Sequence, residues 1–349
     1  MRRRLDVAIS DPTSVRSPGV RLSKLVTIER HRLTTVAFGG TRHAKRQRRN
    51  AEMTSQLVAL CFDANDPLRL ARFWAEALRW DVGDETGDVV SLVPTDGTRF
   101  QIDFGPVPEP KGAWANRLHL DLTTTSLDDQ TEAVERLIEL GGQHIDIGQG
   151  PEDEHVVLAD PEGNELCIIE PTNSFLSTCG RLGSITCDGT RQVGYFWSAA
   201  LGWPLVWDQN EETAIRAPDL AGPMITWGGA PLNPKLGKNR LHLDIAPLAH
   251  GDQQAELDRL ISLGARRIDI GQGDVDWAVM ADPDDNEFCV LTPRSQRIAG
   301  ITAEPGSVVA RELHSQLNTI ASVGARDMCE SRIREVARIS LAAMRSRRR

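Results

Sequence analysis

The segment Asn116-Arg-Leu-His-Leu-Asp121 recurs further along the chain as Asn239-Arg-Leu-His-Leu-Asp244. Three more pairs of segments recur in the same order, with nearly the same offset: Arg136–Gly141 with Arg259–Gly264, Ile145–Gly150 with Ile268–Gly273, and Ala159–Cys167 with Ala281–Cys289. Ordered self-similarity of this kind indicates an internal duplication. We therefore expect the same globular unit twice, at residues 53–172 and 181–295, joined by a linker at 173–180.

Each unit has the pattern strand, helix, three strands, and repeats this pattern once. In the first unit we expect strands at 57–63, 80–83, 89–93 and 99–104 around a helix at 67–78, then strands at 117–122, 144–147, 156–159 and 165–169 around a helix at 127–140. Phe73 and Trp74, like Phe196 and Trp197, have helical spacing and are expected in the core, as is Trp227. The simplest expectation is that each unit folds as a complete domain with its own sheet.

A turn is predicted at Asp160-Pro-Glu-Gly-Asn164, because proline fixes φ and glycine accepts positive φ. Asp285 replaces that glycine in the second unit. Aspartate tolerates the left-handed region better than most residues, so the turn should survive there.

Charge is distributed unevenly along the chain. The middle of the sequence carries 17 basic against 40 acidic residues, whereas residues 1–52 carry 13 against 4 and residues 296–349 carry 10 against 5. An acidic surface repels phosphates, so nucleic acid is a poor partner for the middle. The longest apolar runs have strand length, so no membrane partner is expected either.

Outside the two units the sequence has few signs of a packed core. Residues 1–52 are basic and aperiodic and are interpreted as a disordered extension, while residues 296–349 form a basic, partly helical tail whose helix is either solvated or docks on a partner. The six cysteines show neither a CxxC pair nor zinc-finger spacing, and the N-terminus has no apolar signal-type stretch. A cytoplasmic protein is the expectation from these features.

This double strand-helix-three-strand order resembles the glyoxalase-like domains of the vicinal oxygen chelate superfamily. The resemblance rests on Asp66-Pro67 before a helix with Phe73-Trp74-x3-Leu78, and on Asp160-Pro-x-Gly-Asn before the last strand. It implies an α+β fold of two tandem domains, each a curved mixed sheet built from two βαβββ modules. Members of the superfamily include isomerases, dioxygenases, epimerases, thiol transferases and metal-free proteins that sequester drugs, so the resemblance does not fix a reaction.

The resemblance implies a cup-shaped face, and strand alternation shows which side chains should enter it. The candidates for catalysis are His119 and His242. The alternative for each is a histidine that is hydrogen-bonded inside the cup and takes no part in catalysis. The candidates for contact with a ligand are Gln101, Asp103, Trp114, Asp121, His155, Cys167, Thr226, Asp244, Trp277 and Cys289. Trp114 and Trp277 could stack on a planar molecule, and His155 takes the place of Trp277 in the first unit.

Metal enzymes of this superfamily hold their ion with His or Glu from the first and last strands of each module. His119 and His242 match a ligand position, but the first-strand position is Ala59 or Ser184 and the last-strand position is Cys167 or Cys289. We therefore expect no metal and no cofactor. The exception to test is zinc in the first unit, where Asp103 or Asp63 could complete a set with His119 and Cys167.

Three functions follow as hypotheses. The first is a metal-free protein that binds a small, neutral or cationic organic molecule, as a drug-resistance protein does by sequestration. The second is a lyase or isomerase in which His119 or His242 is a general base oriented by Asp121 or Asp244. The third is a structural or interaction module with vestigial cups. Whether the protein forms a homodimer is left open.

The purified protein should lack stoichiometric Mg²⁺, Mn²⁺ or Fe²⁺, because thiols and alanine replace the oxygen and nitrogen ligands these ions prefer. Elemental analysis checks this. A content near one such ion per domain, lost in the variant His119→Ala with His242→Ala, would contradict the prediction.

A chain that begins at Met53 should keep the melting temperature of the full chain, because residues 1–52 have too little apolar surface to offset the entropy of ordering. Thermal denaturation of the two chains checks this. A loss of several degrees would mean that the extension packs on the acidic middle.

Overall fold

The computed structural model describes residues 54–83, 88–150 and 153–294. The expected N-terminal extension and C-terminal tail lie outside the described residues, so the predictions about them stay predictions. Among the described residues, no helix is both long and apolar enough to cross a membrane.

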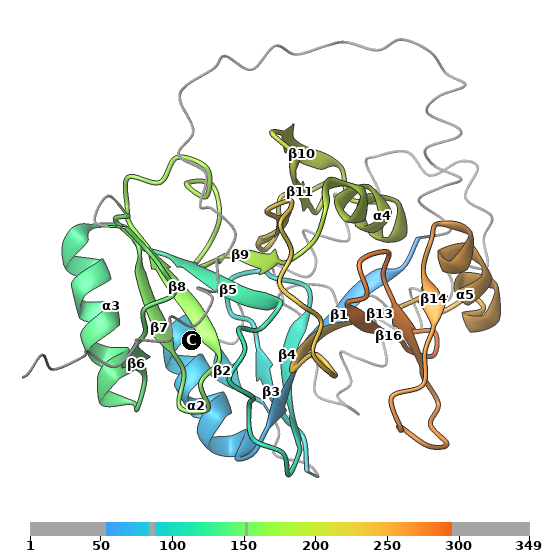
Figure 1. The fold of residues 1–349 in the computed structure, drawn as a ribbon, viewed down its shortest axis with the longest axis horizontal. Coiled ribbons are helices and arrows are strands. Elements are labelled where there is room, and N and C mark those ends of the chain that lie inside the picture. The colour runs from blue at the N-terminus through green and yellow to red at the C-terminus, as the bar shows by residue number, and fades with distance from the viewer. Residues whose placement is uncertain (1–53, 84–87, 151–152, 295–349) are drawn as a thin grey trace, which may run out of the picture. The chain divides into compact units, whose positions relative to one another are not determined.

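Four βαβββ modules follow one another in the chain (Figure 1). The modules of the first repeat are β1 (Gln56–Ala64), α2 (Pro67–Leu78), β2 (Asp81–Val82), β3 (Val90–Val93), β4 (Gln101–Pro106), and then β5 (Leu118–Thr123), α3 (Leu127–Glu139), β6 (Gln143–His144), β7 (Val156–Ala159), β8 (Glu165–Ile169). Those of the second are β9 (Leu182–Cys187), α4 (Arg191–Leu201), β10 (Leu205–Gln209), β11 (Glu212–Arg216), β12 (Met224–Trp227), and then β13 (Leu241–Ala246), α5 (Gln253–Ser262), β14 (Arg266–Arg267), β15 (Ala278–Ala281), β16 (Glu287–Val290). The element order predicted from the sequence is confirmed.

The local sequence explains where the helices begin. At α2 the side chain of Asp66 accepts a hydrogen bond from the backbone of Arg69 at 3.0 Å, and Pro67 occupies the first turn. The buried face of the helix contains Phe73 and Trp74, which are 1% and 0% exposed. These aromatic residues are core residues, as predicted, and so are their counterparts in α4.

The strands form two eight-stranded mixed sheets, and each sheet takes one module from each repeat. Sheet A has the order β14-β15-β16-β13-β1-β4-β3-β2, and sheet B has the order β10-β11-β12-β9-β5-β8-β7-β6. In Figure 1 β1 accordingly lies beside β13, although the two strands are far apart in the sequence. The α+β class with two modules per sheet is confirmed, but the expectation that residues 53–172 close their own sheet is wrong.

The physical reason is that the first strands of all four modules are interchangeable in pattern. Each first strand offers a free edge, and two such strands pair antiparallel at the centre of each sheet: β1 with β13, and β5 with β9. Either choice of partner buries the same alternating apolar residues. The repeat therefore predicts that modules pair, but it does not predict which modules.

The two modules of one repeat are held together by a buried carboxylate in the turn before the last strand. Asp160 Oδ2 accepts hydrogen bonds from Trp74 Nε1 at 3.0 Å and Asn164 Nδ2 at 2.8 Å. Its Oδ1 accepts from the backbone amides of Glu162 and Asn164 at 2.9 Å. The repeated Trp and the repeated Asp-Pro turn thus bind each other, and this contact links sheet A to sheet B.

The second repeat contains the equivalent contact. Trp197 Nε1 donates to Asp282 Oδ2 at 3.2 Å. Burial raises the pKa of Asp160 despite its hydrogen-bond donors, and it raises the pKa of Asp282 to about 6. Asp285 adopts φ 69°, in the same left-handed region as Gly163 at φ 88°, so the prediction that the turn survives is confirmed.

Replacing Asp160 with alanine should lower the free energy of unfolding by about 3 kcal/mol, because several buried donors lose their acceptor at once. Asp282→Ala should have a similar effect. Urea denaturation followed by circular dichroism measures both. The control is Arg136→Ala, which removes exposed ion pairs with Glu76 and Glu139 and should cost under about 0.5 kcal/mol. Equal stability of Asp160→Ala and this control would refute the linking role of the turn.

Candidate functional site

The face of sheet B opposite the helices, called cup B below, centres on His119 and Asp121. Both side chains come from β5, where alternation turns them to the same face. His119 lies opposite Thr186 of β9, and Asp121 lies opposite Ser184 on one side and Cys167 of β8 on the other. The register of three strands therefore brings the cluster together.

Asp121 is the best-connected member of this cluster. Its Oδ2 accepts hydrogen bonds from Ser184 Oγ and Thr186 Oγ1, both at 2.6 Å, and its Oδ1 lies 3.3 Å from His119 Nε2. Thr226 Oγ1 extends the network to Thr186 Oγ1 at 3.0 Å. Burial disfavours the charge of Asp121, but the hydrogen bonds and charge of His119 and the two hydroxyl groups outweigh burial and lower its pKa. The carboxylate is therefore ionised at neutral pH.

The thiol beside this carboxylate is a poor nucleophile. Cys167 is 2% exposed and packs in an apolar cluster with Val157 and Ile169. Burial and the charge of Asp121 raise the pKa of the Cys167 thiol well above its usual range. Cys167 therefore acts as a small, buried apolar residue rather than as a nucleophile.

A cavity of about 60 Å³ adjoins the cluster, with room for a few waters or a group of a few non-hydrogen atoms. Phe175 and Trp207 form its aromatic wall, with ring centroids 5.9 Å apart in an edge-to-face arrangement. Its polar side consists of His119, Asp121, Asn173, Ser184, Thr186, Glu212, Thr213 and Thr226. Ile145 and Ile147 of the repeated Ile-Asp-Ile loop pack against the apolar cluster that contains Cys167.

Several residues that line the cavity have a buried polar atom that makes no hydrogen bond to a described residue. They include Nε1 of Trp207 and Nε1 of Trp227, both donors, Oγ1 of Thr213, and Oδ1 of Asp121, an acceptor that lies 3.3 Å from His119 Nε2. Buried polar groups in native proteins are nearly always paired, so an unpaired donor and an unpaired acceptor beside one cavity call for an explanation.

The corresponding face of sheet A, called cup A, combines residues of both repeats. Cys61 of β1 lies opposite His242 of β13, and Asp244 lies opposite Cys289 of β16. His242 Nε2 is 3.3 Å from Asp244 Oδ1. On the neighbouring strands Asp103 Oδ1 accepts hydrogen bonds from Gln101 Nε2 and Ser91 Oγ, both at 2.6 Å.

This arrangement corrects the expected grouping of site residues. Gln101 and Asp103 belong to the first repeat but share a cup with His242, while Thr226 belongs to the second repeat and shares a cup with His119. The zinc set expected from His119, Cys167 and either Asp103 or Asp63 is therefore wrong, since those aspartates are in sheet A. The cause is the pairing of modules across the repeats.

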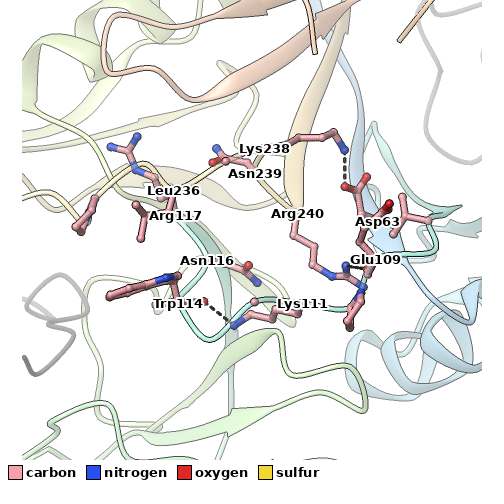
Figure 2. A pocket seen from close by; sticks show the side chains of 16 residues that line it. Asp63, Glu109, Lys111, Trp114, Asn116, Arg117, Leu236, Lys238, Asn239 and Arg240 are labelled. Atoms are coloured by element: carbon pink, nitrogen blue, oxygen red, sulfur yellow. Dashed lines mark hydrogen bonds and ion pairs between the residues drawn. The ribbon is translucent and has the colours of Figure 1, made fainter. Parts of the chain in front are cut away.

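Other candidates lie outside the two polar clusters. Trp114 is 51% exposed and lines a groove of about 350 Å³ between two repeat-equivalent loops, shown in Figure 2. The basic residues of this groove are already neutralised: Lys111 by Glu165 at 2.9 Å, Lys238 by Asp63, Arg117 by Asp188 at 3.2 Å, and Arg240 by Glu162 at 2.7 Å. Trp277 is 41% exposed, His155 is half-buried, and neither lines the two cavities described here.

Sequence reasoning missed the aromatic wall of cup B. Phe175 lies in the segment expected to be a linker, and Trp207 lies on an edge strand with a register irregularity, so neither position shows a clear alternation. Ser184 and Thr186, by contrast, could have been chosen as site residues, because their strand alternates regularly and ends at the level of the histidine.

The metal implied by the family resemblance does not fit these residues. Ala59 offers no ligand atom, Ser184 already donates to Asp121, and the last-strand positions are thiols whose pKa is raised by burial. Mg²⁺, Mn²⁺ and Fe²⁺ prefer oxygen and imidazole ligands. The residues at the ligand positions therefore give no basis for a reaction that uses Mg²⁺, Mn²⁺ or Fe²⁺.

Comparison with known proteins agrees with the fold. A family model described as a glyoxalase-like domain matches residues 59–169 and 184–291. No curated protein matches the chain.

Two solved structures illustrate the likeness. A glyoxalase I variant from Zea mays superposes with a TM-score of 0.50 at 12% identity, over 71% of this chain and 96% of that chain. A glyoxalase-related enzyme from Fulvimarina pelagi gives a TM-score of 0.29 at 20% identity, over 37% of this chain and 96% of that chain. The two matched segments together span more than half of the sequence. The chain thus belongs to the glyoxalase-like domain family of the vicinal oxygen chelate superfamily, and it carries two tandem copies of the domain.

Proposed function

We propose that this protein binds a small, neutral or cationic organic molecule in cup B, and that no metal ion takes part in this binding. The observation that carries the proposal is that residues lining the cavity include a buried donor and a buried acceptor that make no hydrogen bond to a described residue, Trp207 Nε1 and Asp121 Oδ1. A molecule that presents an acceptor to the indole and a donor to the carboxylate would satisfy both.

The surroundings of the cavity favour a particular charge on the ligand. Asp121 is ionised and buried, so an anion in the cavity would be repelled by the negative charge of this carboxylate. A neutral amide or an amidinium group meets no such repulsion, and a cation also gains from the faces of aromatic rings such as Trp207. The size of the cavity suggests that it takes one polar end of a ligand, with the rest of the molecule outside it.

A lyase or isomerase activity remains a second candidate because His119 and Asp121 form a pair beside the same cavity. Their separation of 3.3 Å suits a carboxylate that orients an imidazole for proton transfer. Sequestration leaves the bound molecule unchanged, whereas turnover changes it. The mass of a natural ligand, recovered from the protein before and after prolonged incubation, separates these two candidates.

Trp207→Phe should weaken binding of acetamide about fivefold, because the ring stays and one hydrogen bond of about 1 kcal/mol is lost. Saturation-transfer NMR titrations with acetamide, guanidinium and acetate make the measurement. Acetamide and guanidinium should bind the unmodified protein, and acetate should not.

The melting temperature of Trp207→Phe without ligand should be unchanged or higher, since the indole N–H has no partner in the protein. Trp277→Phe is the matched control, because it makes the same change at an exposed position outside the cavity. Equal acetamide affinity in the two variants, or binding of acetate as tight as that of acetamide, would refute the proposal.

A further inference from the structure

The groove beside Trp114 lies between the two loops that cross from one sheet to the other, and it is called the crossover groove below (Figure 2). One loop joins β4 of sheet A to β5 of sheet B, and the other joins β12 of sheet B to β13 of sheet A. The volume of about 350 Å³ is in the range of sites for small molecules. Its lining residues differ from those of the cavity in cup B.

Both loops are fixed by the same kind of contact. Lys111 Nζ pairs with Glu165 at 2.9 Å and donates to the backbone oxygen of Trp114 at 2.8 Å. In the second loop Lys235 pairs with Glu287 at 2.6 Å. The walls of the groove are therefore preformed, so a ligand would pay little for ordering them.

The two loops differ just before their repeated Asn-Arg segments, and this makes the groove asymmetric. Trp114 of the first loop has Gly237 as its counterpart, and Lys238 of the second loop has Ala115. Trp114 is 51% exposed, and Leu236 of the facing loop is also exposed. In Figure 2, Trp114 lies toward one end of the groove and the ammonium group of Lys238 toward the other. One end thus suits an aromatic ring and the other end suits a charged group.

The groove gathers basic residues in a part of the chain that is acidic as a whole. The middle of the sequence carries 17 basic against 40 acidic residues. The charged residues that line the groove are four basic and two acidic ones: Lys111, Arg117, Lys238, Arg240, Asp63 and Glu109. Among the four ion pairs of the groove described above, that of Lys238 with Asp63 is the most exposed, at 36% and 19% for the two side chains. The ammonium of Lys238 is therefore the cation that an anionic ligand reaches most easily.

Arg240 contributes a buried donor that no described residue satisfies. Its side chain is 9% exposed and makes three hydrogen bonds through the Nη atoms, one of them to Glu162 at 2.7 Å. Its Nε makes no hydrogen bond to a described residue. The counterpart of Arg240 in the other half, Arg117, donates from Nε to Asp188 at 3.2 Å. The difference between the two arginines needs an explanation, because buried donors are nearly always paired.

The explanation is that Lys238 holds the carboxylate that Arg240 lacks. The backbone N–H of Asp63 donates to the backbone oxygen of Arg240 at 2.8 Å, just as that of Asp188 donates to Arg117 at 2.6 Å. Asp63 is thus the counterpart of Asp188, but its side chain pairs with Lys238. Once released from Lys238, Asp63 could accept from Arg240 Nε in the way that Asp188 accepts from Arg117.

We propose that the crossover groove binds an aromatic carboxylate, with the ring against Trp114 and Leu236 and the carboxylate on Lys238. Asp63 then turns to Arg240 Nε, so that one ion pair is replaced by two and the buried donor is satisfied. A single ion pair at an exposed position is weak, so the ring supplies much of the affinity. A carboxylate without a ring, such as acetate, should bind poorly. The site is separate from cup B and does not depend on the function proposed for that cup.

The test compares the affinity of the full chain for 3-phenylpropionate with its affinity for the methyl ester, by saturation-transfer NMR titration. The ester keeps the ring but has no charge for Lys238, so it should bind at least about tenfold more weakly. The ester also lacks an N–H or O–H donor for Asp121, so it does not meet the requirements proposed for cup B.

Lys238→Ala gives the second loop the residue that the first loop has at this position. This variant should therefore fold, and thermal denaturation verifies it. Its affinity for 3-phenylpropionate should fall at least about tenfold, because the carboxylate loses its cation. Arg266→Ala is the matched control, since it removes a cation from an exposed ion pair outside the groove, and it should keep full affinity.

Trp114→Ala should also lower the affinity for 3-phenylpropionate about tenfold, because the ring of the ligand loses its aromatic wall. Trp277→Ala is the matched control at an exposed position outside the groove. Trp207→Phe, which weakens acetamide binding in cup B, should leave the affinity for 3-phenylpropionate unchanged. This variant separates the failure of one proposal from the failure of the other.

Equal affinity for the acid and the ester would overturn the proposal, and so would full affinity for the acid in Lys238→Ala or in Trp114→Ala. A loss of affinity in Trp207→Phe as large as that in Trp114→Ala would place the acid in cup B and would also overturn it. If Lys238→Ala does not fold, the comparison of acid with ester and the Trp114→Ala variant still decide the question.

Discussion

The antiparallel pairing of β1 with β13 and of β5 with β9 determines the composition of both cups. Each pair lies at the centre of an eight-stranded sheet, and the strands that carry the cluster residues lie on either side of it. This pairing places Cys61 opposite His242 and Thr186 opposite His119. A different choice of partners would leave the fold class unchanged but would give each histidine other neighbours.

The two cups have diverged in the residues around a preserved His-Asp pair. His119 with Asp121 and His242 with Asp244 have the same separation of 3.3 Å. Around the first pair the partners are hydroxyl groups, which hold the carboxylate in place and lower its pKa. Around the second they are thiols, whose pKa the carboxylate helps to raise. Duplication thus gave both cups the same His-Asp pair, and substitutions on the first strands changed the side chains around it.

The sequence predicts the elements well because their signals are local. The helical spacing of Phe73 and Trp74, the alternation in Leu118–Thr123, and the turn at Asp160 each depend on a few neighbouring residues. The inward-facing side chains follow from the same alternation. The partners of each strand do not, because the first strands of all four modules satisfy the same pattern. For this reason the sequence assigned Asp103 to the cup of His119 and Thr226 to the cup of His242. The sequence does not predict the aromatic wall of cup B either, because Phe175 and Trp207 lie in segments without a regular pattern of alternation.

The pairing of first strands also has a consequence for how the chain acquires its structure. Gln56 pairs with Ala246, so the centre of sheet A joins the first and the fourth modules, whereas sheet B closes between neighbouring modules. Contacts of such long sequence separation form slowly, because a large loop must close first. During synthesis, β1 would present an open edge until the fourth module leaves the ribosome, and sheet B could already be complete. The contact between Trp74 and Asp160 could then act during folding. It would hold the first module against sheet B before β13, the partner of β1, has been synthesised.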